Sequence, residues 1–211
     1  MAGIPVSVRT ARKADVSELA SVLGRAFFDD PPFEWMLPDE RSRERRGAGV
    51  FRAILRSHAM RYRGVDVASG GAGMAGGAGI AGGAIWLPPG HWAPTAGQQL
   101  RALPGNVRAL GRRIGPASEL AAAMGHHHPR QEHWYLYAIG VDPARQGHGV
   151  ASALLRSRLE RCDADARPAY LESTKPGSVP LYEHFGFEVT GTLNPPKGAP
   201  PLTAMWRSPR G

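Results

Sequence analysis

The chain has 211 residues, a formal net charge of +8 and a hydrophobic content of 42%. This hydrophobic content excludes a chain that stays unfolded, and no apolar run approaches the roughly 18 residues that a membrane span needs. A single cysteine excludes an internal disulfide framework, and the length suits one domain over residues 1–211. The first residues lack the apolar core of a secretion signal, so we expect a cytoplasmic protein with no membrane partner.

The excess of basic residues could bind a nucleic acid or a ligand that carries several phosphates. These residues are scattered singly through residues 41–63 and 101–113, without a dense block or interleaved aromatic residues. The pattern therefore favours a phosphorylated ligand, and we expect no nucleic-acid partner.

The first part of the chain predicts a strand, a helix and a turn. Residues 6–10 alternate as a strand does. Asp15 and Glu18 have the spacing of a capping box, and the apolar stripe that follows predicts a helix ending near Asp29. Two prolines interrupt residues 29–38, so we predict an irregular turn there rather than a helix.

The middle of the chain predicts a second helix, two strands and a helical insertion. The helix is expected at residues 40–61, the strands at 64–68 and 84–87, and the insertion, in two helical pieces, at about 94–125. Residues 70–83, between the strands, are rich in glycine but complete no phosphate motif. We therefore predict a flexible loop there rather than a nucleotide cradle.

A strand, a glycine loop and a helix follow one another within residues 134–162. Residues 134–141 are aromatic and β-branched, a proline at position 143 ends the run, and apolar residues from Val150 onward have helical spacing. Glycines let the backbone approach an anion, and N–H groups at the start of a helix point at it. The sequence therefore predicts a phosphate-binding loop at residues 146–152.

This loop has a recognisable sequence, Gln146-Gly147-His148-Gly149-Val150-Ala151. It completes neither a dinucleotide fingerprint nor a P-loop, but it matches Q/R-x-x-G-x-G/A, the pyrophosphate loop of the GNAT superfamily of N-acetyltransferases. Downstream, residues 169–173 predict a short strand, and residues 181–187, LYEHFGF, resemble the superfamily's (F/L)YExxGF signature. The chain thus resembles the GNAT superfamily, and within it most closely the puromycin-type N-acetyltransferases and their actinobacterial relatives.

The resemblance implies an α/β (α+β) fold in which helices flank a mixed, mostly antiparallel, twisted sheet whose fourth and fifth strands splay apart. It implies direct acetyl transfer from acetyl-CoA to a primary amine of a small molecule, an antibiotic or a metabolite, in a ternary complex. A protein lysine or N-terminal acetyltransferase and a non-catalytic acyl-CoA sensor remain as alternatives. We expect a monomer or a homodimer.

The resemblance also implies where the cofactor lies. The pantetheine arm would occupy the gap between the splayed strands, held by backbone groups of the fourth strand. Gly140 agrees with this placement, because a glycine within a strand often marks a bulge or a close backbone approach. The residues expected to bind the cofactor are Ile139, Gly140, Val141, Gln146, Gly147, His148, Gly149, Val150, Ala151 and Ser152.

Two residues are the first candidates for proton transfer. Tyr182, the tyrosine of the signature, is the expected general acid for the departing thiolate, with a packed core tyrosine as the alternative. Glu172, on the predicted fifth strand, is the first candidate for the base, since burial would raise the pKa of its carboxyl group. It could instead order a water molecule or pair with an arginine. Asp29, Asp30, Glu34 and His133 also remain as possible bases.

In the GNAT superfamily the segment that corresponds to residues 29–38 covers the acceptor site. Carboxylates beside aromatic rings would suit a cationic, partly apolar amine, and an ordinary capped turn is the alternative. The residues expected to bind the acceptor are Phe28, Asp29, Asp30, Glu34, Trp35 and His133. Residues 126–128 are three adjacent histidines, which point in divergent directions and have no further ligand at suitable spacing, so no metal site is predicted.

Overall fold

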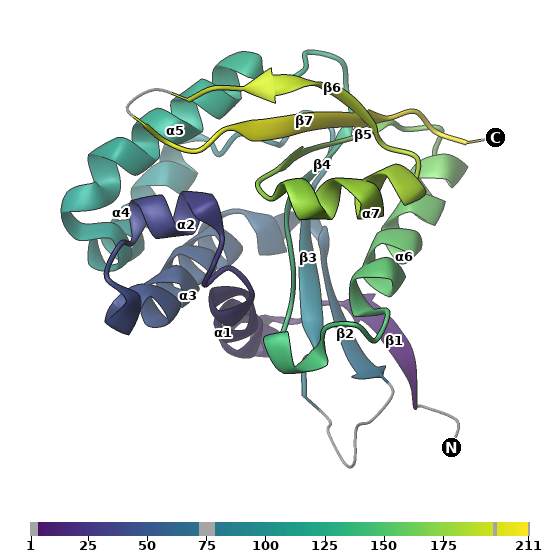
Figure 1. The fold of residues 1–211 in the computed structure, drawn as a ribbon, viewed down its shortest axis with the longest axis horizontal. Coiled ribbons are helices and arrows are strands. Elements are labelled where there is room, and N and C mark those ends of the chain that lie inside the picture. The colour runs from purple at the N-terminus through teal and green to yellow at the C-terminus, as the bar shows by residue number, and fades with distance from the viewer. Residues whose placement is uncertain (1–3, 72–78, 196–197, 211) are drawn as a thin grey trace.

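The computed structural model describes residues 4–71, 79–195 and 198–210, which form a twisted sheet with helices on both sides (Figure 1). The centre of the predicted flexible loop, residues 72–78, lies outside the described residues. Its ends, residues 70–71 and 82–83, belong to strands. None of the described helices has the length and apolar character that crossing a membrane requires.

The described residues form the predicted elements and two further helices, at residues 31–36 and 179–184. The strands are β1 Ile4–Thr10, β2 Val65–Gly71, β3 Gly82–Leu87, β4 Trp134–Val141, β5 Ala169–Ser173, β6 Glu188–Leu193 and β7 Leu202–Arg207. The helices are α1 Val16–Ala26, α2 Pro31–Met36, α3 Glu40–Ser57, α4 Ala96–Leu110, α5 Ile114–His127, α6 Val150–Ala164 and α7 Val179–His184. Short 3-10 turns span Lys13–Asp15, Ala59–Tyr62, Gly111–Arg113, Pro143–Arg145 and Pro176–Ser178.

The sheet has the order β1-β2-β3-β4-β5-β7-β6. Its described strand pairs are antiparallel, apart from the parallel pair of β4 and β5. β4 and β5 pair only through residues 134–136 and 169–171, after which the two strands separate. The predicted mixed, mostly antiparallel sheet with splayed fourth and fifth strands is therefore confirmed.

A β-bulge lies where the two strands begin to separate. Ile85 of β3 pairs with Ala138 and Trp86 pairs with Leu136, so Tyr137 is the extra residue on β4. A bulge bends its strand and increases the local twist, which turns the end of β4 away from β5.

Gly140 is not at the bulge but at a close approach to α1. A Cβ atom at this position would lie 2.8 Å from Cβ of Ala26 and 2.9 Å from Cδ2 of Leu23. Of the two roles that a glycine within a strand can have, the structure shows the close approach.

Helices cover both faces of the sheet; in Figure 1, α2, α3 and α4 lie to the left of β3 and α6 lies to its right. Neighbouring residues of β3 meet different helices, since a Cβ atom at Gly83 would meet Leu19 of α1 and one at Gly82 would meet Val150 of α6. Two apolar cores result, and on β5 Tyr170 belongs to the first and Leu171 to the second.

Small residues let α1 and α3 pack closely. A Cβ atom at Gly24 would lie 2.7 Å from the carbonyl oxygen of Glu44 and 2.9 Å from Cβ of Ala48. Gly47 also faces this contact, because its added Cβ atom would lie 3.8 Å from Cα of Gly24. Glycine weakens an isolated helix, so here tertiary packing outweighs local propensity.

The prediction of an irregular turn at residues 29–38 was wrong, because residues 31–36 form α2. Pro31 and Pro32 occupy the first two helical positions, where a backbone N–H has no partner within the helix. The two prolines therefore begin this helix rather than interrupt it.

The capping box predicted from Asp15 and Glu18 was also wrong. The Asp15 carboxylate accepts hydrogen bonds from the Arg9 guanidinium at 2.7 Å and from the N–H of Arg12 at 2.6 Å. Glu18 instead accepts from the N–H of Ile80 at 2.7 Å. Both acids thus connect α1 to other segments.

Candidate active site

A cleft of about 350 Å³ lies where β4 and β5 separate. Residues 136–141 of β4 form one wall, and residues 171–175 at the end of β5 form another. Tyr182 of α7, Asp30 before α2, Gln146 of the glycine loop and Ala151 of α6 also line it. The fold thus collects segments that are far apart in the chain around a space within the range of small-molecule sites.

β4 presents backbone groups to this cleft. Beyond residue 136, β4 pairs with β3 on one edge but has no described partner on the edge that faces β5. The side-chain amide of Gln146 donates to the carbonyl oxygen of Val141 at 3.4 Å. An extended ligand could bind the remaining N–H and C=O groups as an added strand would.

The glycine loop has the geometry that a phosphate site needs. Gly147 and Gly149 have φ values of +79° and +76°, in the left-handed region that favours glycine, and an added Cβ atom would meet nothing within 4 Å at either. Gly149 begins α6 without a side-chain cap, so the first N–H groups of this helix have no partner within it. The open space above the loop can therefore admit an anion.

The residues predicted to bind the cofactor take different positions. Ile139, Gly140, Val141, Gln146 and Ala151 line the cleft. Gly147, His148, Gly149, Val150 and Ser152 do not line it and belong to the loop and first turn beside it. The side chain of Val150 is buried and that of His148 is exposed, so only the backbone of Val150 is available to a ligand.

Tyr182 lies in the cleft on α7, packed edge-on against Phe187 at a ring distance of 6.1 Å. Burial, and then the negative charge of Asp30, raise the pKa of the Tyr182 phenol above its usual value of 10.0. The phenol therefore stays protonated throughout the neutral pH range and can donate a proton.

Asp30 is buried beside Tyr182. The Thr174 hydroxyl donates a short hydrogen bond to Oδ2 of Asp30, and Oδ1 has no partner among the described residues. Burial raises the pKa of the Asp30 carboxyl group from 3.8 to about 6. This carboxyl group can therefore change its charge near neutral pH.

Glu172 lines the same cleft, with a side chain that is 1% exposed. Burial raises the pKa of its carboxyl group from 4.5 to about 7. The hydroxyl groups of Tyr135 and Tyr170 partly offset this rise, although within the described part of the chain neither Glu172 oxygen has a hydrogen bond of normal geometry. Glu172 is thus a carboxyl group that can accept a proton at neutral pH.

Two buried histidines lie behind Glu172. Nδ1 of His128 is 3.9 Å from Oε1 of Glu172, and Nε2 of His128 is 3.0 Å from Nε2 of His133. Nδ1 of His133 is 2.6 Å from the carbonyl oxygen of Gln131. Burial lowers the pKa of both rings, that of His128 to about 3, so both are neutral at pH 7.

The tautomers of these rings follow from the hydrogen bonds. A carbonyl oxygen only accepts, so His133 donates from Nδ1 to Gln131 and its neutral ring has a lone pair on Nε2. His128 must then donate from Nε2, which leaves a lone pair on Nδ1 facing Glu172. From the sequence, His128 was considered only as a metal ligand, because nothing in its spacing links it to Glu172.

The acids predicted to bind an acceptor are not gathered at the cleft. Asp30 lines it, but Asp29 is exposed and accepts from Nζ of Lys175 at 2.7 Å. Glu34 is paired with Arg43 at 3.4 Å. Asp29 and Glu34 thus already have cationic partners within the protein.

The predicted aromatic and histidine residues also lie off the lining. The guanidinium of Arg43 lies over the Phe28 ring, and that of Arg113 lies over Trp35. His133 is buried behind Glu172. Lining residues that sequence reasoning missed include Phe27, Thr174 and Lys175, and the position of the last two directly after β5 is the signal that could have found them.

Comparisons with known proteins agree with this geometry. Residues 105–187, from α4 through the glycine loop to the end of the YExxGF segment, match the model of the Acetyltransferase (GNAT) family. A crystal structure from Corynebacterium glutamicum, described as histone acetyltransferase HPA2 and related acetyltransferase, has a TM-score of 0.73 and 25% identity, covering 100% of this chain and 98% of that one. An uncharacterized N-acetyltransferase of Schizosaccharomyces pombe is 26% identical over 86% of this chain and 74% of its own length. The chain has the GNAT fold, and its residues 105–187 carry the sequence of the GNAT acetyltransferase family.

Two shorter matches fall on parts of this chain. The L-amino acid N-acetyltransferase AaaT of Escherichia coli is 37% identical over 30% of this chain and 42% of its own length. The mycothiol acetyltransferase of Brachybacterium faecium is 41% identical over 26% of this chain and 18% of its own length. These relatives support a likeness to GNAT acetyltransferases, while the likeness to puromycin-type enzymes stays a prediction.

Proposed function

We propose that this protein transfers an acetyl group from acetyl-CoA to a primary amine of a small molecule, directly and without a covalent enzyme intermediate. The observation that carries the proposal is the cleft, where an unpaired strand edge, an anion-ready glycine loop and two titratable carboxyl groups converge. Acetyl-CoA, when bound, supplies the acetyl group as a thioester.

The residues present fit this cofactor. The open space above Gly147 and Gly149 and the free N–H groups at the start of α6 suit the pyrophosphate. The free edge of residues 137–141 suits the amide groups of the pantetheine arm, and an N–H there can stabilise the oxyanion of the reacting carbonyl. The loop binds through its backbone, so the exposed His148 is not essential to it.

Tyr182 would act as the general acid. It lines the cleft on α7, and its raised pKa keeps the phenol protonated at neutral pH until the thiolate leaves. The same rise makes the phenol a weaker acid than a free one. The proton is therefore transferred late, once the thiolate has developed most of its charge.

Glu172 would act as the base for the amine. Its pKa of about 7 leaves a substantial carboxylate fraction at neutral pH, and both of its oxygens are free to accept a proton. Because these oxygens are buried, we propose that the proton passes through a water molecule at the floor of the cleft. Asp30, with a pKa of about 6, is the second candidate for this role and would attract a cationic amine when ionised.

The size of the cleft supports a small acceptor. Its volume of about 350 Å³ must hold both the end of the cofactor and the amine. An antibiotic or metabolite amine follows only from the puromycin-type likeness. A protein lysine is a second candidate, favoured by the name of the C. glutamicum structure, which mentions a histone acetyltransferase.

Calorimetric titration with acetyl-CoA, followed by a thiol-release assay over a panel of amines and lysine peptides, tests the proposal. Gly149→Glu should abolish binding, because its side chain would place a charge in the phosphate space. Gly191→Glu, an exposed glycine of β6 with no atom within 4 Å of an added Cβ, is the matched control and should bind normally. No binding by the native protein would refute the proposal, and binding without turnover on any amine would indicate an acyl-CoA sensor.

A further inference from the structure

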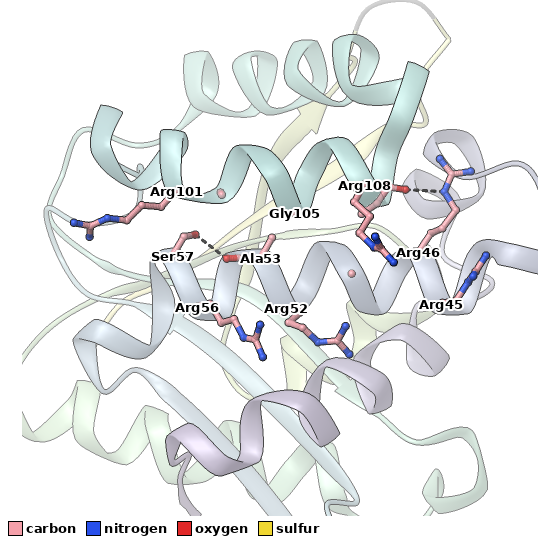
Figure 2. A pocket seen from close by; sticks show the side chains of 12 residues that line it. Arg45, Arg46, Arg52, Ala53, Arg56, Ser57, Arg101, Gly105 and Arg108 are labelled. Atoms are coloured by element: carbon pink, nitrogen blue, oxygen red, sulfur yellow. Dashed lines mark hydrogen bonds between the residues drawn. The ribbon is translucent and has the colours of Figure 1, made fainter.

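A second concave site lies outside the catalytic cleft, between α3 and α4. Figure 2 shows the two helices side by side, and the groove between them has a volume of about 840 Å³. Its described lining contains no carboxylate and no aromatic ring. Six arginines line it: Arg45, Arg46, Arg52, Arg56, Arg101 and Arg108.

Small residues bring the two helices together. A Cβ atom at Gly49 would lie 3.1 Å from Cβ of Ala109, and one at Gly105 would lie 3.2 Å from Cβ of Ala53. All four residues line the groove. The groove therefore has a floor of small residues, and the long arginine side chains extend from the helices on either side of it (Figure 2).

The groove arginines lack the anionic partners that arginines have elsewhere. Arg25, Arg158 and Arg207 pair with Asp142, Asp66 and Asp163. Arg46 donates to the carbonyl oxygens of residues 109 and 110. Within residues 4–71, 79–195 and 198–210, the other groove arginines form no ion pair shorter than 4.0 Å.

Arg52 also carries a hydrogen-bond donor that has no acceptor within the described structure. Its Nε atom is buried and has no hydrogen-bond partner in the described structure. A buried donor without a partner is costly, so a ligand that supplies an acceptor gains more here than at a solvated side chain. The guanidinium group is planar and presents paired donors, which match the oxygens of a phosphate.

We propose that this groove binds the phosphate backbone of a nucleic-acid duplex without reading its sequence. Arg45, Arg52 and Arg56 stand at positions i, i+7 and i+11 of α3, a row of about 16 Å at a rise of 1.5 Å per residue. Arg101 and Arg108 stand at i and i+7 of α4 and form the opposite row. Two rows of cations on one surface can contact the regularly spaced phosphates of a duplex backbone.

Other polyanions fit the groove less well. Proteins that bind single strands stack the bases on aromatic rings, and no aromatic ring lines this groove. A peptide would need apolar pockets for its side chains, whereas the floor here carries only glycine, alanine and serine. The sequence argued against a nucleic-acid partner because its arginines are scattered, but α3 and α4 collect them on one surface.

Fluorescence anisotropy with a labelled duplex of 20 base pairs and mixed sequence tests this site. The full chain is titrated in excess coenzyme A, so that the glycine loop is occupied and cannot hold the duplex. We expect a Kd of about 10⁻⁵ M at about 0.1 M salt. A plot of log K against log salt should have a slope of about −4, since about five unpaired arginines face the ligand.

The decisive variant is Arg56→Glu with Arg108→Glu, one exposed residue from each helix. It should weaken duplex binding at least ten-fold and reduce the salt slope by about 2. Arg156→Glu with Arg161→Glu, both exposed on α6, changes the net charge equally and should weaken binding less than three-fold. Arg56→Gln with Arg108→Gln repeats the test without introducing acids, and circular dichroism checks that all variants fold.

Any of four results would overturn the proposal. No binding at low salt, or an equal loss in the groove and control variants, would show that the groove is not a site. If a single strand bound more tightly than the duplex, contacts to the phosphates of a duplex backbone could not explain the binding. Equal binding of a polyglutamate peptide of matched charge would point to an acidic protein instead.

Discussion

The cleft and the arginine groove hold unpartnered polar groups in opposite environments. In the cleft, Glu172 and Asp30 are buried, and burial raises the pKa of both carboxyl groups toward neutrality. In the groove, Arg45, Arg56 and Arg108 are exposed, and an arginine side chain is a cation in proteins generally. Burial therefore produces carboxyl groups that exchange protons near neutral pH, as acid–base catalysis requires, whereas the guanidinium groups can only attract a ligand.

The two regions also differ in how they are assembled. The cleft depends on a strand pair that separates, so its backbone provides much of the binding surface. The groove depends on two helices that pack through small residues, and arginine side chains provide its charge. Substitutions that remove a single polar atom should therefore affect the cleft through rate and pH dependence, and the groove through salt dependence.

The largest effect is expected for Tyr182→Phe, which keeps the ring but removes the proposed acid. We expect kcat to fall by about 10³-fold, within the usual range for general acid catalysis, with acetyl-CoA binding unchanged. Steady-state kinetics from pH 7 to 9 and calorimetry measure the two quantities. Leu181→Val, at the next cleft position on α7, is the packing control. An unaltered kcat in Tyr182→Phe would remove this tyrosine from the mechanism.

The next effect is expected for Glu172→Gln, with a fall in kcat/KM of about 10²-fold. Only the ionised carboxyl group accepts a proton, so the native rate should rise with pH and level off above about 7. The variant should lack this rise. Asp30→Asn is the matched control and should keep it. If the rise survives in Glu172→Gln but disappears in Asp30→Asn, the base is Asp30, whose pKa is about 6.

The same carboxyl group should make stability depend on pH. Its pKa is raised in the folded state from 4.5 to about 7, so folding favours the protonated form, and this contribution is lost as pH rises through about 7. Between pH 5 and 8 the native chain should lose about 2 kcal/mol of unfolding free energy relative to Glu172→Gln. Urea unfolding of both chains at the two pH values gives this difference. Parallel behaviour of the two chains would show that Glu172 is not desolvated.

The smallest effect is expected for His128→Ala, which acts through Glu172. Removing the ring should let water reach the carboxyl group, so that the pKa of Glu172 falls and the rise in rate moves to lower pH. We expect kcat to decrease about ten-fold with little change in KM, as for a positioning residue. His127→Ala, on the neighbouring exposed histidine, should leave the pH profile unchanged. A profile that stays in place in His128→Ala would show that the histidine pair has only a packing role.

Much of the fold could be predicted because its signals are local. The aromatic run at 134–141, the glycine loop and the apolar stripe of α6 each lie within one continuous segment. Local rules failed where a residue's role depends on its position in an element or on a distant partner. Pro31 and Pro32 begin a helix that they would otherwise interrupt, and Glu18 bonds to Ile80 rather than to its own helix.

The sequence by itself determined the order of the first five strands, the glycine loop and the resemblance that pointed to Tyr182 and Glu172, because each is written in consecutive residues. Only the tertiary structure decided which of these groups are buried, and burial sets the pKa values of Asp30, Glu172 and His128. It alone placed His128 behind Glu172 and brought the arginines of α3 and α4 to one groove. These contacts join residues far apart in the chain, so neither periodicity nor spacing records them.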